Sequence, residues 1–71
     1  MTPKAFADAL IRLGVSRQRD ASAFLCVSQS RISEFRNGKR EVPEYIEASI
    51  QAHLMLSEAQ LLTLKQLRGI S

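Results

Sequence analysis

The stretch QRDASAFLCVSQSRISEFRN, residues 18 to 37, decides the fold because it holds two short helical patterns joined by a tight turn. In its second half, Ile32 and Phe35 lie three residues apart among polar residues. That spacing predicts a short helix with a narrow apolar seam. With the seam turned inward, the Gln, Ser and Arg side chains of this helix remain on its outward face.

Local signals predict the limits of both helices. The first is expected over residues 17–25, with Ser16 as its N-cap. The second is expected over residues 29–37, with Ser28 as its N-cap and Gly38 as its stop. Two short helices that are separated by so few residues must cross at a large angle, which is the geometry of a helix-turn-helix.

Three more helices are predicted outside this pair from the same kinds of signal. Their start signals are Thr2 followed by Pro3, then Pro43, and then a capping box formed by Ser57 and Gln60. No alternation of β-branched residues is long enough to indicate a strand. We therefore expect one compact all-α domain of five helices over residues 1–71.

The size and the cysteine content limit how the fold can be stabilised. A chain of 71 residues buries a small core and is marginally stable without further support. Cys26 is the only cysteine, so no internal disulfide can form, and no Cys/His cluster is available for zinc. We expect no metal, no cofactor and no small-molecule ligand, with self-association as the support. Cys26 itself is expected as a buried or half-buried turn residue.

Hydropathy and charge indicate the surroundings of the protein. No apolar run reaches the roughly 18 residues that a membrane span needs, so a cytoplasmic protein without a membrane partner is expected. Residues 1–40 hold eight of the ten Lys and Arg side chains and have a net charge of +5, whereas residues 41–71 have a net charge of −2. A basic half favours a polyanionic partner, and nucleic acid is the commonest one in the cytoplasm.

Residues 18 to 37 resemble the helix-turn-helix of the Cro and lambda-repressor-like (XRE-type) family of small phage and bacterial DNA-binding regulators. The resemblance is carried by Gln18, Ala21, Ser22, Leu25, Val27, Ile32, Phe35, Asn37 and Gly38. Two positions depart from the family pattern: Cys26 stands where a turn glycine is usual, and Ser22 where alanine is usual. A non-glycine residue with a positive φ costs about 1 kcal/mol, so we expect a turn that is either slightly strained or differently shaped.

The resemblance implies that the helix over residues 29–37 enters the major groove of double-stranded DNA, where Gln and Arg can pair with base edges. The base-reading residues that it implies are Gln29, Ser30, Arg31 and Ser33, with Arg31 as the main determinant of specificity. The implied phosphate contacts are Gln18, Arg17, Ser28, Arg36, Asn37, Lys39 and Arg40. Glu34 is expected to be a surface partner of a nearby arginine.

The C-terminal segment, residues 43–71, is expected to contribute helices to a homodimer. Its apolar surface is wider than so small a domain can cover alone. The expected interface residues are Leu54, Leu61, Leu64 and Leu67. The alternative is that these side chains complete the core of a monomer.

The leading functional hypothesis is a dimeric, sequence-specific transcriptional repressor of phage or mobile-element type. It would bind an inverted-repeat operator and, as the resemblance implies, repress its own operon; regulators encoded beside anti-CRISPR genes are a narrower variant. Two alternatives stay open: an antitoxin that binds its own promoter, and a helical protein-interaction module without DNA binding. An enzyme is not expected, because no acid, thiol or second histidine lies at a catalytic spacing from His53.

Overall fold

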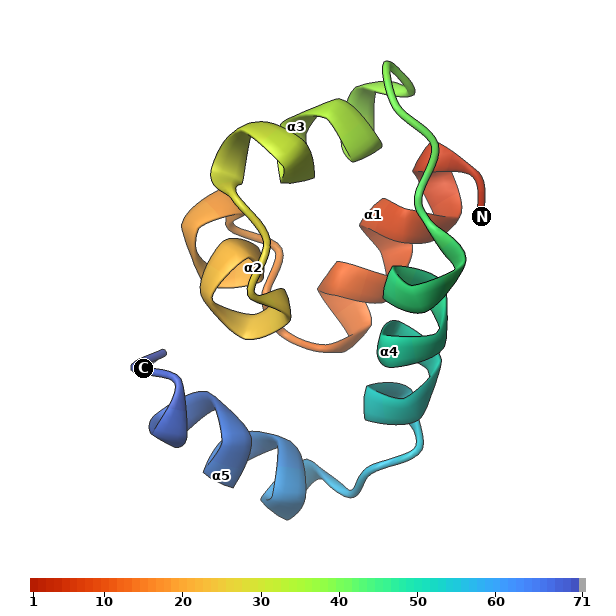
Figure 1. Ribbon diagram of the computed structural model, residues 1–71. Helices are drawn as coiled ribbons and strands as arrows, with labels where there is room; N and C mark the ends of the chain where they lie inside the picture. The colour runs from red at the N-terminus through yellow and green to blue at the C-terminus, as the bar shows by residue number, and fades with distance from the viewer. Residues whose placement is uncertain (71) are drawn as a thin grey trace.

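The computed structural model describes residues 1–70 and folds them into five α-helices without a strand (Figure 1). The helices are α1 (Pro3–Arg12), α2 (Gln18–Leu25), α3 (Gln29–Asn37), α4 (Glu44–Leu54) and α5 (Glu58–Leu67). The predicted all-α class and the five predicted helices are confirmed. Within the described residues, every helix is too short or too polar to cross a lipid bilayer.

Three of the predicted N-terminal signals are confirmed by hydrogen bonds. The Thr2 hydroxyl accepts from the Ala5 amide at 3.1 Å at the start of α1. The Ser28 hydroxyl accepts from the Arg31 amide at 3.2 Å at the start of α3. At the start of α5, Ser57 and Gln60 form a reciprocal capping box with distances of 2.9 and 3.2 Å. Each bond satisfies a backbone donor that the first helical turn leaves without an intrahelical partner.

The prediction that Ser16 caps the second helix is wrong. The helix begins at Gln18, and Arg17 is its N-cap, with no side-chain hydrogen bond at that end. The backbone is still extended at Arg17, at φ −70° and ψ 138°, so Ser16 lies one residue too early to reach the first helical amides. Its carbonyl accepts a hydrogen bond from Nη2 of Arg36 on α3 instead.

Four helices end in the same hydrogen-bonded turn, in which an amide beyond the helix donates to a carbonyl five residues earlier. The pairs are Val15 with Leu10 (2.9 Å), Val27 with Ser22 (3.2 Å), Lys39 with Glu34 (3.0 Å) and Ile70 with Lys65 (2.8 Å). This turn needs one residue in the left-handed conformation. Glycine fills that position in α1, α3 and α5, each time with φ 74°, and Cys26 fills it in α2.

The turn between α2 and α3 is therefore strained at Cys26, which is one of the two predicted outcomes. Its φ of 58° is the only positive φ at a non-glycine residue within the described part of the chain. The expectation that Cys26 is buried or half-buried is wrong, because the left-handed turn leaves the residue exposed. Ser22 closes the same turn a second time, since its hydroxyl donates to the Val27 carbonyl at 2.5 Å.

The hydrophobic core lies between α1, α2, α3 and α4. Its largest fully buried side chains are Phe6, Phe24, Phe35, Leu10, Leu13, Ile32, Ile50 and Val15. Phe6 and Phe35 meet edge to face, with ring centroids 5.5 Å apart, and thereby join α1 to α3. In contrast, α5 contains no buried residue.

A polar cluster attaches the end of α5 to the rest of the domain. Nη1 of Arg68 donates to the Phe24 carbonyl at 2.7 Å and lies 3.2 Å from Nε2 of His53. The guanidinium also lies over the Phe24 ring, 4.8 Å from its centroid. Because Arg68 can only donate, His53 accepts through Nε2, and its Nδ1 donates to the Ser49 carbonyl at 2.6 Å. This cluster joins α2, α4 and the end of α5.

Candidate nucleic-acid interface

Helix α3 is held against the core along one side by two side chains. Ile32 and Phe35 are 0% and 1% exposed, which confirms the predicted apolar seam. In Figure 1, α3 runs along one edge of the molecule, with α1 and α2 on its inner side. The opposite side of the helix is left without covering elements and is the part of α3 that a partner can reach.

The start of α3 carries the most accessible of the predicted base-reading residues. Gln29 and Ser30 are exposed, and Arg31 and Ser33 are half-buried. The Ser28 hydroxyl is exposed and accepts from the Arg31 amide, so its own O–H is free to donate to an anion. The helix dipole adds partial positive charge at this end. The first turn of α3 thus combines exposed donors with a favourable field for phosphate.

Two arginines meet one carboxylate on the polar side of α3. Oε1 of Glu34 lies 3.8 Å from Nε of Arg31 and 3.5 Å from Nε of Arg40. The expectation that Glu34 pairs with a nearby arginine is confirmed. The fold thus brings Arg31, a predicted base-reading residue, and Arg40, a predicted phosphate contact, to the same carboxylate.

The end of α3 and the following loop carry further predicted phosphate contacts. Asn37 is exposed, and its amide nitrogen lies 3.4 Å from the Ser33 hydroxyl, one helical turn earlier. Lys39 and Arg40 are exposed in the loop. Together with Arg31, these residues extend the polar surface from the first turn of α3 to the residues beyond its end.

The start of α2 carries the remaining predicted contacts. Arg17 is exposed, and Gln18 is half-buried at the first helical position. Arg36 is half-buried, and its guanidinium is bound to the Ser16 carbonyl. Its Nε is buried without a hydrogen-bond partner. At least one donor of Arg36 thus holds α3 to the α1–α2 connection.

The predicted dimer residues differ in how far they are exposed. Leu54, Leu61 and Leu64 are half-buried and pack against the core. Leu67, near the end of α5, is 77% exposed. Met55 and Leu62 are also exposed, at 87% and 56%. Three of the four predicted interface residues thus pack partly against the core, while Leu67, Met55 and Leu62 are exposed.

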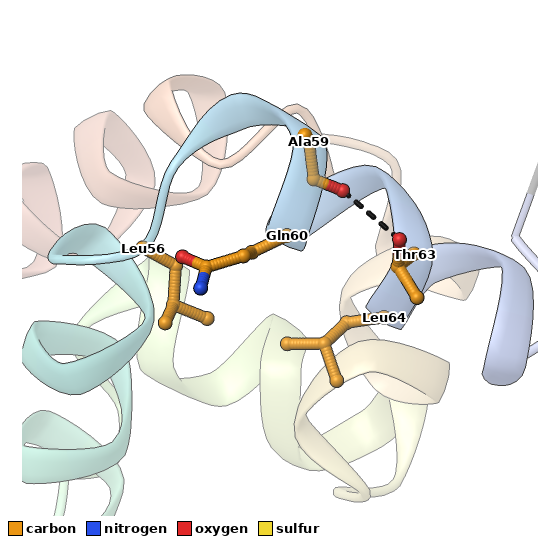
Figure 2. Close-up of a pocket in the computed structure, with 5 residues that line it drawn as sticks. All are labelled: Leu56, Ala59, Gln60, Thr63 and Leu64. Atoms are coloured by element: carbon orange, nitrogen blue, oxygen red, sulfur yellow. Dashed lines mark hydrogen bonds between the residues drawn. The ribbon is translucent and has the colours of Figure 1, made fainter.

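A shallow, largely apolar hollow lies beside α5 (Figure 2). It is lined by Leu56, Ala59, Gln60, Thr63 and Leu64. Figure 2 shows the Leu56 and Leu64 side chains on the same side of the helix, with the Gln60 side chain extending between them. Thr63 is satisfied within the helix, since its hydroxyl donates to the Ala59 carbonyl at 3.0 Å.

Sequence reasoning missed several residues that shape this site. Arg68 was not singled out, and its main partner, Phe24, lies 44 residues earlier in the chain. Val15 and Ile70 are buried core residues outside the helices. A glycine followed directly by an apolar residue, as in Gly14-Val15 and Gly69-Ile70, was the available signal, because an apolar residue after the glycine of such a helix end commonly packs back against the helix.

Comparisons with known proteins add no assignment. The chain has no significant match among protein-family models, curated protein sequences or solved structures. Within residues 1–70, no three His, Cys, Asp or Glu side chains come together in a way that could hold a metal ion.

Proposed function

We propose that this protein is a sequence-specific DNA-binding repressor that uses α2 and α3 as a helix-turn-helix. The observation that carries the proposal is the two-sided character of α3. Its inner side is fixed by Ile32 and Phe35, while Gln29 and Ser30 stand exposed at its first turn. The major groove of B-DNA admits an α-helix, and its base edges present the donors and acceptors that such side chains pair with.

The distribution of charge supports the same function. The net charge of +5 over residues 1–40 includes the exposed Arg17, Lys39 and Arg40. These side chains flank α3 at the start of α2 and in the loop after α3, which are the places where a chain docked through α3 would meet phosphates. Base contacts would come from Gln29, Ser30, Arg31 and Ser33. Phosphate contacts would come from Gln18, Arg17, Ser28, Arg36, Asn37, Lys39 and Arg40.

We further propose that the repressor acts as a homodimer on an inverted-repeat operator. Leu62 and Leu67 on α5 and Met55 at the end of α4 are apolar side chains that the domain leaves exposed. In Figure 1, α5 and α3 lie at opposite sides of the molecule, so a contact through α5 leaves α3 free. Two-fold symmetry would present two α3 helices to half-sites about one helical turn of DNA apart. Binding over a promoter would then repress by excluding polymerase.

Selection of binding sites from random duplex DNA with the purified protein tests the proposal. We expect an enriched inverted repeat, and an affinity that falls steeply as salt rises because phosphate contacts release counterions. A protein that retains no DNA at low salt would exclude the function. An enriched site without two-fold symmetry would exclude the dimeric mode of binding alone.

Two substitutions separate base reading from phosphate binding. Replacement of Arg31 with alanine is expected to cost about 1 to 3 kcal/mol of binding free energy and to relax the preference at one base pair. Replacement of Lys39 with alanine is expected to weaken binding to all sequences alike and to reduce the salt dependence by about one counterion. Competition titrations against single-base variants of the selected site measure both effects. An unchanged sequence preference in the Arg31→Ala variant would refute its base-reading role.

A second candidate function, a helical protein-interaction module, is favoured by the exposed apolar side chains near α5. Met55 and Leu67 are 87% and 77% exposed, so both apolar side chains are accessible to a partner protein. An antitoxin would combine such a surface with promoter binding. Co-purification of a small partner protein together with salt-dependent DNA binding would favour the antitoxin, and a partner without DNA binding would favour the module.

A further inference from the structure

Glu34 occupies a central place among the cations of α3. A single oxygen, Oε1, lies 3.8 Å from Nε of Arg31 and 3.5 Å from Nε of Arg40. Both distances exceed the usual range of an N–H···O hydrogen bond, so the attraction is mainly between charges. The carboxylate thus partly neutralises two arginines that the proposed function assigns to DNA.

These ion pairs are accessible and exchangeable. The side chains of Glu34, Arg31 and Arg40 are 36%, 44% and 48% exposed. Ion pairs at this level of exposure contribute little to stability, because water and salt compete with them. Breaking them therefore barely changes the stability of the fold. Their main effect is on the binding of other anions by the two guanidinium groups.

The sign of the charge on Glu34 is opposite to that of its surroundings. The other acidic residues within residues 1–40 are Asp8 on α1 and Asp20 on α2, so Glu34 is the only acid on α3. A carboxylate on a helix that enters a groove of DNA is repelled by the phosphates on both sides. Glu34 therefore lowers the affinity for every DNA sequence, unless its pairing with the two arginines favours some sequences over others.

We propose that Glu34 is a specificity-determining residue that holds Arg31 and Arg40 away from non-specific DNA. This inference rests on the proposed function. Random DNA offers the two arginines only phosphate attraction, against which the ion pairs with Glu34 and its repulsion compete. At a correct site the two Nη groups of Arg31 can pair with the two acceptors of a guanine edge while Nε stays beside Glu34, so the ion pair is kept there. Glu34 thereby weakens non-specific binding more than specific binding.

The test is the Glu34→Gln variant, which keeps the size and polarity of the side chain and removes its charge. We expect its affinity for a random-sequence duplex of about 30 base pairs to rise about three- to tenfold at 50 mM salt, with a salt dependence steeper by about one counterion. Affinity for the best site selected by the wild-type protein should rise less. The ratio of specific to non-specific affinity should therefore fall.

Glu41→Gln is the matched control. Glu41 is an exposed glutamate in the loop after α3, and it takes no part in either ion pair of Glu34. The substitution makes the same change in net charge close to the same surface. A second control places Glu34→Gln in the Arg31→Ala background, where the gain in non-specific affinity should shrink because one of the two released cations is missing.

The outcomes separate this inference from the proposed function. If the wild-type protein binds no duplex DNA, both are wrong. If it binds DNA but Glu34→Gln behaves like Glu41→Gln, or lowers non-specific affinity, the role of Glu34 is wrong and the proposed function stands. A rise in non-specific affinity that is confined to Glu34→Gln and reduced without Arg31 supports the inference.

Discussion

Helices α3 and α5 have nearly the same length but are held in the domain in different ways. Two side chains of α3, Ile32 and Phe35, are fully buried, and the rest of the helix is polar. In α5 no residue is buried, and the helix is attached by the half-buried Leu61 and Leu64 and by Arg68 just beyond its end. Two well-placed anchors orient α3 without a wide apolar face, whereas the many leucines of α5 leave part of its apolar surface uncovered.

The largest expected difference concerns the buried anchors. Replacement of Phe35 with alanine should destabilise the domain by about 3 to 5 kcal/mol, which is enough to unfold much of a domain this small. Replacement of the half-buried Leu64 with alanine should lower the stability by only about 1 to 2 kcal/mol. Urea unfolding followed by circular dichroism measures both. Equal losses would mean that α5 is anchored as firmly as α3.

The next effect concerns the polar attachment of α5. Replacement of Arg68 with methionine keeps much of the side-chain length but removes the hydrogen bonds to the Phe24 carbonyl and to His53. We expect a loss of about 1 to 2 kcal/mol. Arg12→Met, at an exposed arginine on α1, is the control and should change stability by less than about 0.5 kcal/mol. The same small change for both variants would show that the attachment contributes nothing.

A smaller effect concerns the uncovered apolar side chains. Replacement of Leu67 with glutamate should raise the dissociation constant of the dimer at least about tenfold, equivalent to about 1.4 kcal/mol, because it puts a charge into an apolar contact. Sedimentation equilibrium measures the change, and Gln66→Glu at the exposed neighbouring position is the control. Monomeric wild-type protein at high concentration would show that this surface does not pair with a second copy.

The smallest effect lies in the turn that precedes α3. Cys26 is exposed and has φ 58°, so its replacement with glycine removes strain without removing buried contacts. We expect a gain of about 0.5 to 1 kcal/mol in thermal or urea unfolding. Gly38→Ala should instead destabilise the domain, because the φ of Gly38 is 74° and the added Cβ would lie 3.3 Å from Cγ of Pro3. A Cys26→Gly variant that is less stable than the wild type would contradict the claim that the backbone is strained at Cys26.

Local signals were sufficient to predict the elements of this fold. Thr2, Ser28 and the pair of Ser57 and Gln60 act within one helical turn, so their neighbours in sequence are also their partners in space. The seam of Ile32 and Phe35 follows from helical spacing alone. Ser16 misled because a cap depends on where the backbone becomes helical, and Arg17 remains extended.

Non-local contacts could not be predicted in the same way. The attachment of Arg68 to Phe24 depends on how α5 returns beneath α2, which no local pattern indicates. How far each predicted interface residue is covered also depends on tertiary packing: Leu54, Leu61 and Leu64 are partly buried against the core, whereas Leu67 is exposed. At the polar surface, the pairing of Glu34 with an arginine was expected. That Arg40 joins Arg31 at the same carboxylate requires the loop to fold back toward α3.

The double closure of the turn at Ser22 and Val27 has a consequence for recognition. Each residue donates one hydrogen bond to the carbonyl of the other, through the Ser22 hydroxyl and the Val27 amide. A hinge at this point would have to break both bonds, so α3 keeps its orientation relative to α2 before any encounter. Little orientational entropy is then left to lose on docking, and the Val27 amide should be among the slowest in the chain to exchange its hydrogen for deuterium.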